Sequence, residues 1–443
     1  MRYNLVVLGG GPAGYTGALR AAKLGMSVAL VEADKVGGTC LNRGCIPTKC
    51  LLKSSSLYAS RSEWSEFGVR TEGAVSLDED AVYARKDAVV TALRDGILAL
   101  VKAGKIVLYP FKGRLVSAHE VEAGGEIVEG DNVLIATGSR PAVPNVKGAQ
   151  YALTSDDVLE APVSGDRIAV IGGGVIGSEF ACYFNDTGKS VTVLEYADKI
   201  LPALGKEISQ QMTAAFRRKG IAVHTSARVT EIGKDFVKFT VGDEKRTLEC
   251  DAVISATGRR AVTEDIGLEN VGLPVGAPVA VDGNMMTSVA GVYAAGDVTG
   301  GIQLAHYAAA CAVKAVHAMA GRADAPDLSV VPSLIYTEPE IAVVGNTTTA
   351  AKSGKFLLGA NGKSLINGSN RGFIKVYCDD KDRVVGAELF GHGVTELMGE
   401  LALAVKCGLS AQQVADTVHA HPTVYESVAE ACEDVFGLAV HKR

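Results

Sequence analysis

One pattern occurs twice in this chain and restricts its fold more than any other feature. A short apolar strand runs into three spaced glycines, a helical stretch follows, and a second apolar strand ends in glutamate. The first copy spans residues 5–32 and the second spans residues 168–195. Each copy has the form of a βαβ unit with a Gly-x-Gly-x-x-Gly turn, which is typical of Rossmann-type dinucleotide sites. The repeat therefore predicts two α/β domains that each bind a dinucleotide.

The three glycines of each turn are expected to have different tasks. The first allows a tight turn, the second lets the backbone approach a pyrophosphate, and the third lets the helix pack on the strand. The N–H groups at the start of the following helix then face the phosphates. The candidate cofactor-binding glycines are Gly9, Gly11 and Gly14 in the first copy and Gly172, Gly174 and Gly177 in the second.

A glutamate closes each copy at the point where a ribose would lie. Glu32 and Glu195 are expected to accept hydrogen bonds from a ribose diol. Because a carboxylate there repels a 2′-phosphate, Glu195 favours NAD over NADP. Two dinucleotides in one chain suggest a flavin together with a nicotinamide, so the expected cofactors are FAD and NAD.

Three further turns follow short apolar strands. Ala-Thr-Gly ends at Gly138 and again at Gly258, and each is expected to close a buried strand of its own nucleotide domain. The third turn, Gly296-Asp297, follows a buried strand, and Asp297 is placed to hold a ribityl hydroxyl. These residues join the candidate cofactor site, although Gly-Asp alone is also an ordinary turn.

Composition excludes several classes of protein. The net charge of −6 and the lack of a long basic run argue against a nucleic-acid partner. No apolar stretch approaches the ~20 residues of a membrane span, and the chain enters its first strand without a secretory cleavage site. Nine scattered cysteines do not suggest a secreted disulfide framework. We therefore expect a cytoplasmic protein.

A cysteine pair follows directly after the first glutamate and therefore lies beside the first dinucleotide. It belongs to residues 37–49, which read Gly-Gly-Thr-Cys-Leu-Asn-Arg-Gly-Cys-Ile-Pro-Thr-Lys. No second cysteine pair completes a zinc site, so no metal is expected. One turn of distorted helix would bring Cys40 and Cys45 together, and a helix start near Lys49 favours a Cys45 thiolate. A thiolate against a flavin can pass two electrons, while the alternative is a pair of inert buried cysteines.

Near the C-terminus, His421-Pro422 precedes Glu426 by about one helical turn. Imidazole titrates near neutral pH and suits a base that takes a proton from a thiol. A carboxylate on the other ring nitrogen would set the tautomer. His421 and Glu426 are therefore a candidate acid–base pair, and the alternative is a histidine that merely starts a helix.

These motifs together resemble the pyridine nucleotide–disulfide oxidoreductases and, within them, the dihydrolipoamide dehydrogenases. The resemblance covers essentially the whole chain, with every motif in the family's order. It implies a redox-active Cys40–Cys45 disulfide, and it implies that His421 and Glu426 act on the dithiol of the partner subunit of a homodimer with shared active sites. It also adds the following flavin-side residues: Thr39, Lys49, Glu179 as the partner of Lys49, and Leu304 and Ala305 along the isoalloxazine ring.

The implied reaction is oxidation of protein-bound dihydrolipoamide to lipoamide with reduction of NAD to NADH. The implied partners are lipoyl carrier domains of 2-oxoacid dehydrogenase complexes or of the glycine-cleavage system. The expected fold is α/β, with two Rossmann-like domains and a C-terminal α+β interface domain. The expected boundaries are 1–143 and 271–330 for the two parts of the FAD-binding domain, 144–270 for the NAD-binding domain and 331–443 for the interface domain.

Related activities fit less well. A glutathione reductase would carry arginines after the second strand, where Tyr196, Ala197 and Asp198 stand here. Mercuric reductases and large thioredoxin reductases need a C-terminal cysteine pair, which residues 437–443 lack. A non-catalytic subunit that keeps both cofactors as structural ligands is a further alternative. Residues 346–355 depart from the family, in which a longer acidic helix and strand are expected.

Overall fold

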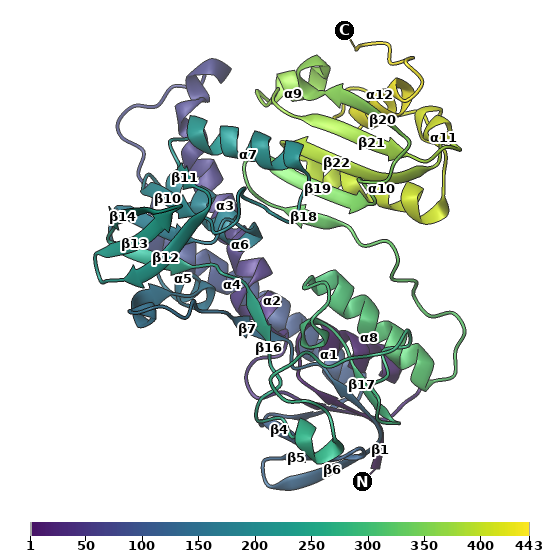
Figure 1. Cartoon of the computed structure of the whole chain (residues 1–443). Helices are drawn as coiled ribbons and strands as arrows, with labels where there is room; N and C mark the ends of the chain where they lie inside the picture. Colours follow the sequence, from purple (N-terminus) through teal and green to yellow (C-terminus); the bar gives the residue numbers. More distant parts are fainter. Residues whose placement is uncertain (1, 443) are drawn as a thin grey trace. The chain divides into compact units, whose positions relative to one another are not determined.

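The computed structural model describes residues 2–442, which form two compact units. The first unit contains the chain up to Asn145 together with Ala152–Ser164 and Ile254–Leu328. The second unit contains Val146–Tyr151, Gly165–Val253 and the chain from Ser329 onward. Figure 1 shows the elements of both. These units group the chain differently from the three expected domains and their four segments, whose boundaries therefore stay a prediction.

The first unit is built on a sheet in the order β3-β2-β1-β6-β5-β4, and β17 also pairs with β6. The strands β1, β2, β3, β6 and β17 run parallel, while β4 and β5 form an antiparallel excursion. The bounds of its strands are β1 Arg2–Leu8, β2 Val28–Val31, β3 Val107–Tyr109, β4 Gly113–Ser117, β5 Glu120–Ala123, β6 Glu126–Ile135 and β17 Val292–Ala294.

Both faces of this sheet are buried at its centre, which is why the last four residues of β1, 5–8, are a continuous apolar run. Leu5 and Val7 point into a core beneath the helices α1 (Pro12–Lys23) and α8 (Ala305–Met319). Val6 and Leu8 point into the opposite core, against the β4–β5 excursion. Figure 1 shows α1 and α8 packed side by side on the sheet. This arrangement is the predicted parallel α/β fold.

The remaining elements of the first unit surround the ends of these strands. A two-stranded ribbon pairs β7 with β16. Their bounds, with those of the other elements, are α2 Gly38–Arg43, α3 Cys45–Ala59, η1 Ser60–Ser62, η2 Trp64–Phe67, α4 Glu79–Ala103, β7 Ser139–Pro141, β8 Ala152–Leu153, α5 Ser155–Glu160, β16 Arg259–Ala261, η4 Leu268–Val271 and η5 Asp297–Thr299.

The second unit begins with the second copy of the repeat. Its parallel strands lie in the order β11-β10-β9-β15, and an antiparallel sheet β12-β13-β14 follows β11 along the chain. The bounds are η3 Ala149–Tyr151, β9 Arg167–Ile171, α6 Val175–Asp186, β10 Ser190–Leu194, α7 Lys206–Arg218, β11 Ala222–His224, β12 Ala227–Ile232, β13 Phe236–Val241, β14 Glu244–Glu249 and β15 Ala252–Ser255. The repeat therefore forms two Rossmann-type starts, as predicted.

The C-terminal part of the second unit is the expected α+β fold. Its antiparallel sheet has the order β18-β19-β22-β21-β20, and its helices bury a shared core against it. The bounds are β18 Ser333–Ile335, β19 Glu340–Gly345, β20 Lys352–Leu357, η6 Leu358–Ala360, α9 Gly362–Ile366, β21 Phe373–Cys378, β22 Val384–Gly391, α10 Val394–Cys407, α11 Ala411–Ala415 and α12 Glu426–Asp434.

Three details of this part differ from the sequence-based expectation. The edge strand β20 was not predicted, because only Phe356 and Leu357 of its residues are large and apolar. Its Gly354 faces α12 so closely that a Cβ would lie 2.1 Å from the Ala431 carbonyl oxygen. The sequence pattern also predicts helices at roughly 410–418 and 424–435, whereas in the structure α11 ends at Ala415 and α12 begins at Glu426. Residues 346–351 form a loop, and the strand β20 follows it.

Candidate active site

The first glycine-rich loop joins β1 to α1. Gly9 has φ +105°, and a Cβ there would lie 2.4 Å from the Ala136 carbonyl oxygen. A Cβ on Gly14 would lie 1.8 Å from the Gly9 carbonyl oxygen. At Gly11 the nearest atom to such a Cβ is the Gly38 Cα, 3.8 Å away. The fold itself therefore requires the first and third glycines, and the second leaves the space that a pyrophosphate needs.

The second loop repeats this geometry between β9 and α6. Gly172 also has φ +105°, Gly177 is buried in the first turns of α6, and a Cβ on Gly174 would have no atom of the described residues within 4 Å. Gly11 and Gly174 are the N-cap residues of α1 and α6, so each helix begins at the open position. Both loops thus fit a dinucleotide phosphate at a helix N-terminus.

Glu32 and Glu195 hold these loops in the same way. Glu32 accepts hydrogen bonds from the amides of Gly10 at 2.5 Å and Asp34 at 2.8 Å. Glu195 accepts from the amides of Gly173 at 2.6 Å and Ala197 at 2.7 Å. Burial raises the pKa of Glu32, while the Gly10 amide opposes that shift. Carboxylate oxygens accept more than one bond each, so both residues still fit a ribose diol.

The two predicted redox cysteines are joined in the structure. Cys40 lies in α2, Cys45 begins α3, and the two form a disulfide with their Cα atoms 4.7 Å apart. Gly44 separates the two helices, and a Cβ there would lie 2.8 Å from the Thr39 carbonyl oxygen. The sulfurs therefore meet across a break between two helices rather than within one distorted turn. Lys49 lies on α3, about one turn beyond Cys45.

The start of α2 lies against the first glycine-rich loop. The Gly37 amide donates to the Gly10 carbonyl oxygen at 2.8 Å. A Cβ on Gly38 would lie 2.5 Å from the Gly11 Cα. The disulfide is therefore built onto the segment that touches the first dinucleotide loop, as its place in the sequence predicted.

A polar cluster that sequence reasoning missed lies beside Asp297. Arg259 donates from Nε to the Ser139 hydroxyl oxygen at 2.7 Å and from Nη2 to the Ser139 carbonyl oxygen at 2.8 Å. The Ser139 hydroxyl donates to Asp297 at 2.5 Å, and Arg259 Nε lies 3.9 Å from the same carboxylate. Burial lowers the pKa of Arg259.

A sequence signal for this cluster existed. Ser139, Arg259 and Asp297 each follow directly after a predicted turn glycine, namely Gly138, Gly258 and Gly296. The three turns therefore end at one place. Ser139 donates to Oδ2 of Asp297, and Arg259 holds Ser139 in place, so the carboxylate has a fixed direction in which its other oxygen can accept from a hydroxyl.

Two further predicted flavin-side residues lie at the start of α8. Leu304 is its N-cap and Ala305 its first residue. A Cβ on Gly296 would lie 3.1 Å from the Ala308 Cβ and 3.4 Å from the Ala13 Cβ. The Gly296-Asp297 turn therefore lies close to the first turns of both α1 and α8, and their N-terminal dipoles act on the same region.

Glu179 is buried in α6 of the second unit, where it accepts a hydrogen bond from the Tyr336 amide at 3.0 Å. Lys49 belongs to the first unit. Their expected pairing beside the flavin therefore stays a proposal.

The predicted acid–base pair is formed. His421 Nδ1 lies 2.9 Å from Glu426 Oε1, and the Thr423 amide donates to Glu426 Oε2 at 2.9 Å. The Thr423 amide, together with His421, holds the pKa of Glu426 below its ordinary value. The His421–Pro422 peptide bond is cis, and the imidazole is 80% exposed. With Nδ1–H on the carboxylate, Nε2 keeps the lone pair of a base.

A neighbouring histidine has a different environment. His419 lies with Nε2 2.9 Å from Glu400 Oε1 and Nδ1 2.7 Å from the Thr417 carbonyl oxygen, and only 7% of its side chain is exposed. Both ring nitrogens are therefore occupied, which suits a supporting role rather than proton transfer.

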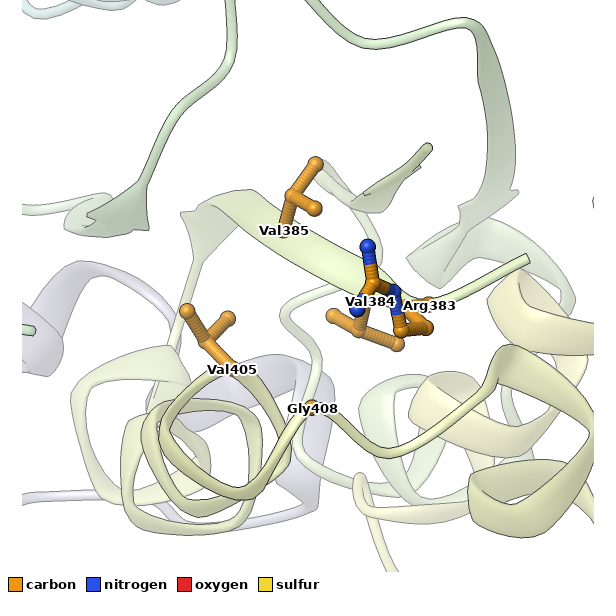
Figure 2. Close-up of a pocket in the computed structure, with 5 residues that line it drawn as sticks. All are labelled: Arg383, Val384, Val385, Val405 and Gly408. Carbon is orange, nitrogen blue, oxygen red and sulfur yellow. The ribbon is translucent and has the colours of Figure 1, made fainter. Parts of the chain in front are cut away.

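A separate hollow lies beside β22 and the end of α10 (Figure 2), and none of the predicted site residues lines it. Its lining consists of Arg383, Val384, Val385, Val405 and Gly408. Within residues 2–442, no group of His, Cys, Asp and Glu side chains is arranged to hold a metal ion, and none of the helices is long and apolar enough to span a membrane.

Comparison with known proteins identifies the family. Residues 3–312 match the family described as pyridine nucleotide-disulphide oxidoreductase, and residues 331–432 match its dimerisation domain. The chain belongs to the pyridine nucleotide-disulphide oxidoreductases. The predicted oxidoreductase activity, the cofactors FAD and NAD and the α/β fold with a C-terminal dimerisation domain are thereby confirmed. The dimerisation domain supports the predicted homodimer.

Several curated members of this family are similar over their full length. Dihydrolipoyl dehydrogenase of Bacillus subtilis is 39% identical, with 99% of each chain covered. The enzyme of the same name from Chlamydia pneumoniae is 37% identical, with 97% of this chain and 96% of the relative covered.

Among solved structures, LpdA from Mycobacterium tuberculosis superposes with a TM-score of 0.89 at 27% identity, covering 98% of this chain and 99% of that one. The HOCl-induced flavoprotein disulfide reductase RclA from Escherichia coli gives a TM-score of 0.86 at 26% identity, covering 97% and 99%.

Proposed function

We propose that this chain oxidises protein-bound dihydrolipoamide to lipoamide and reduces NAD to NADH, as a dihydrolipoyl dehydrogenase. The observation that carries the proposal is the Cys40–Cys45 disulfide built onto the first dinucleotide loop. The names and identities of the curated relatives support the choice of substrate. The partners would be lipoyl carrier domains of 2-oxoacid dehydrogenase complexes or the glycine-cleavage carrier.

The first chemical step is thiol–disulfide exchange. His421 of the partner subunit takes the proton of one substrate thiol, and the resulting thiolate attacks Sγ of Cys40. The Cys40–Cys45 bond breaks, and Cys45 leaves as a thiolate. The sulfur of the second substrate thiol then attacks the substrate sulfur bound to Cys40, and its proton passes to the leaving Cys40 sulfur. This step releases the lipoyl disulfide and leaves Cys40 as a thiol and Cys45 as a thiolate. Two substrate thiols are oxidised, the protein disulfide is reduced, and Glu426 stabilises the imidazolium.

The remaining residues would bind the cofactors. Bound FAD supplies a two-electron acceptor that passes a hydride to NAD. Gly11 and the start of α1 would hold its pyrophosphate, Glu32 its ribose and Asp297 its ribityl chain. Gly174, Glu195 and the start of α6 would hold NAD in the same manner.

The decisive experiment compares substrates on the purified chain. We expect a yellow flavin absorption band, and oxidation of NADH by lipoamide at a rate far above that with NADPH or with glutathione disulfide. A chain that takes up no flavin, or one that prefers glutathione disulfide, would contradict the proposal. A chain that binds flavin and NAD but turns over no disulfide would be the non-catalytic alternative.

A further inference from the structure

Asn42 lies in α2 between the two redox cysteines, and its side chain reaches back to the turn before the helix. Its Nδ2 atom lies 3.2 Å from the Lys35 carbonyl oxygen, 3.2 Å from that of Val36 and 3.0 Å from that of Gly38. The two N–H bonds of this amino group are thus shared among three carbonyls of residues 35–38, a segment we call the linking turn.

The orientation of the Asn42 amide is determined by these contacts. If the amide were reversed, its oxygen would face three carbonyl oxygens, and acceptors repel one another. In the observed orientation Oδ1 is buried, and it has no hydrogen-bond partner among the described residues. The side chain therefore keeps its contacts with the three carbonyls and leaves Oδ1 without a hydrogen bond among the described residues, although an unpartnered buried acceptor is unfavourable.

The linking turn also contacts the first dinucleotide loop. Gly37 donates its amide to the Gly10 carbonyl oxygen at 2.8 Å, and Gly38 is so close to Gly11 that a Cβ would lie 2.5 Å from the Gly11 Cα. Asn42 is two residues beyond Cys40 in the same short helix. One continuous set of contacts thus runs from the open glycine of the loop, through the linking turn and Asn42, to the disulfide.

We propose that Asn42 is a positioning residue that holds the Cys40–Cys45 pair in register with the first dinucleotide loop. It acts through the linking turn, not by touching substrate. The short helix α2 has six residues and ends at Arg43, so it lacks the length to be rigid by itself. If α2 shifted along the loop, the position of Cys45 relative to the flavin would change. That position matters because electron transfer from the Cys45 thiolate to the flavin requires contact between the two. This part of the proposal rests on the proposed function.

The test uses the full chain loaded with FAD and two variants. Asn42→Asp keeps the side-chain shape but places an oxygen before three carbonyls, while Asn42→Ala removes the donors. The readout is the long-wavelength absorbance between the Cys45 thiolate and oxidised flavin, measured after two-electron reduction and divided by bound FAD. We expect at least a twofold loss for Asn42→Ala and a larger loss for Asn42→Asp. The KM for NADH should stay unchanged.

The matched control is Asn270→Ala, which also removes an amide-to-carbonyl hydrogen bond, 2.7 Å to Leu115, but one outside the redox segment. It should keep the full absorbance per flavin. Unfolding temperatures of the variants identify any general loss of stability. Asn42→Ser, which retains one donor, should recover part of the absorbance lost in Asn42→Ala.

The possible failures are distinguishable. If the unmodified chain binds no flavin or shows no long-wavelength absorbance, the proposed function fails. If the unmodified chain shows it and both Asn42 variants keep it at full strength per flavin, only the positioning role is overturned. If all three Asn42 variants fail to fold while Asn270→Ala folds, Asn42 is a folding determinant and the positioning role is likewise overturned.

Discussion

His421 and Glu426 are joined by a 2.9 Å contact between Nδ1 and Oε1, although the imidazole is largely exposed. Glu426 is in turn held by the Thr423 amide through its other oxygen. The carboxylate therefore has a set direction before any substrate arrives, and it presents the histidine with Nε2 outward. A base oriented in this way needs no rearrangement to accept a proton.

Replacement of His421 should slow thiol oxidation strongly. We expect His421→Gln to lower kcat with lipoamide by on the order of 10²–10⁴-fold, because a general base contributes a rate enhancement of this size. The flavin spectrum should not change. His119→Gln is the control, because the exposed ring of His119 contacts the Asp131 carbonyl oxygen at 3.1 Å and lies outside the predicted site. A loss below threefold for His421→Gln would remove the histidine from the mechanism.

The disulfide predicts a difference between two nearby cysteines. Cys45→Ser should abolish lipoamide turnover and the thiolate–flavin absorbance, because no disulfide can form. Cys50→Ser changes a buried cysteine on the same helix that has no disulfide partner in the described part of the chain, and it should retain both properties. Stopped-flow reduction by dihydrolipoamide measures the effect, and equal behaviour of the two variants would contradict the assignment.

The open glycines predict cofactor-specific defects without loss of the fold. Gly174→Ala meets no atom within 4 Å in the described residues, so the variant should fold, keep FAD and lose affinity for NAD by tenfold or more. Gly11→Ala should instead weaken FAD binding. Gly96→Ala, in the middle of α4 and equally open, is the control and should change neither affinity. Titration of each variant with each cofactor measures these affinities, and the opposite pattern would contradict the assignment.

Arg259 should contribute to flavin affinity through Asp297. Arg259→Met removes two hydrogen bonds to Ser139 and leaves the Asp297 carboxylate without its nearby cation. We expect the dissociation constant of FAD to rise about tenfold, the scale of one hydrogen bond to a charged group. Arg140→Met, which breaks only an exposed pair with Glu264, is the matched control. Equal affinities of the two variants in a flavin fluorescence titration would argue against the cluster.

Asp251 should make stability depend on pH in acid. Arg167 hydrogen bonds, with the Arg167 and Asp166 amides, lower the pKa of Asp251 to about 2. Because the folded pKa lies below the unfolded value of about 3.9, the stabilisation is complete above pH 4 and is lost as pH falls towards 2. Asp251→Asn should therefore lower the unfolding temperature at pH 7, and the difference should shrink below pH 4. Asp243→Asn, at an exposed position, should show no such trend.

Much of the candidate site could be predicted because its determinants are local. Gly9 and Gly172 adopt φ +105°, which few residues other than glycine tolerate, and the pattern of strand, turn and helix lies within one short segment. The Cys40–Cys45 disulfide and the His421–Glu426 contact each join residues five positions apart. Contacts between residues so close in the chain can be predicted from a sequence, because local backbone geometry is enough to bring the two residues together.

Other features depended on packing over long distances. Ser139 meets Arg259 across 120 positions and Asp297 across 158, and that meeting follows from two separate strand pairings, β7 with β16 and β6 with β17. The strand β20 exists because Gly354 lets α12 approach, although its own residues have a weak strand pattern. The sequence by itself determined the two glycine-rich loops, the redox pair and the acid–base pair, since each is a short-range constraint on the backbone. Only the tertiary structure decided which turns converge on Asp297 and how Asn42 ties the disulfide to the loop, because these contacts depend on how separate elements pack.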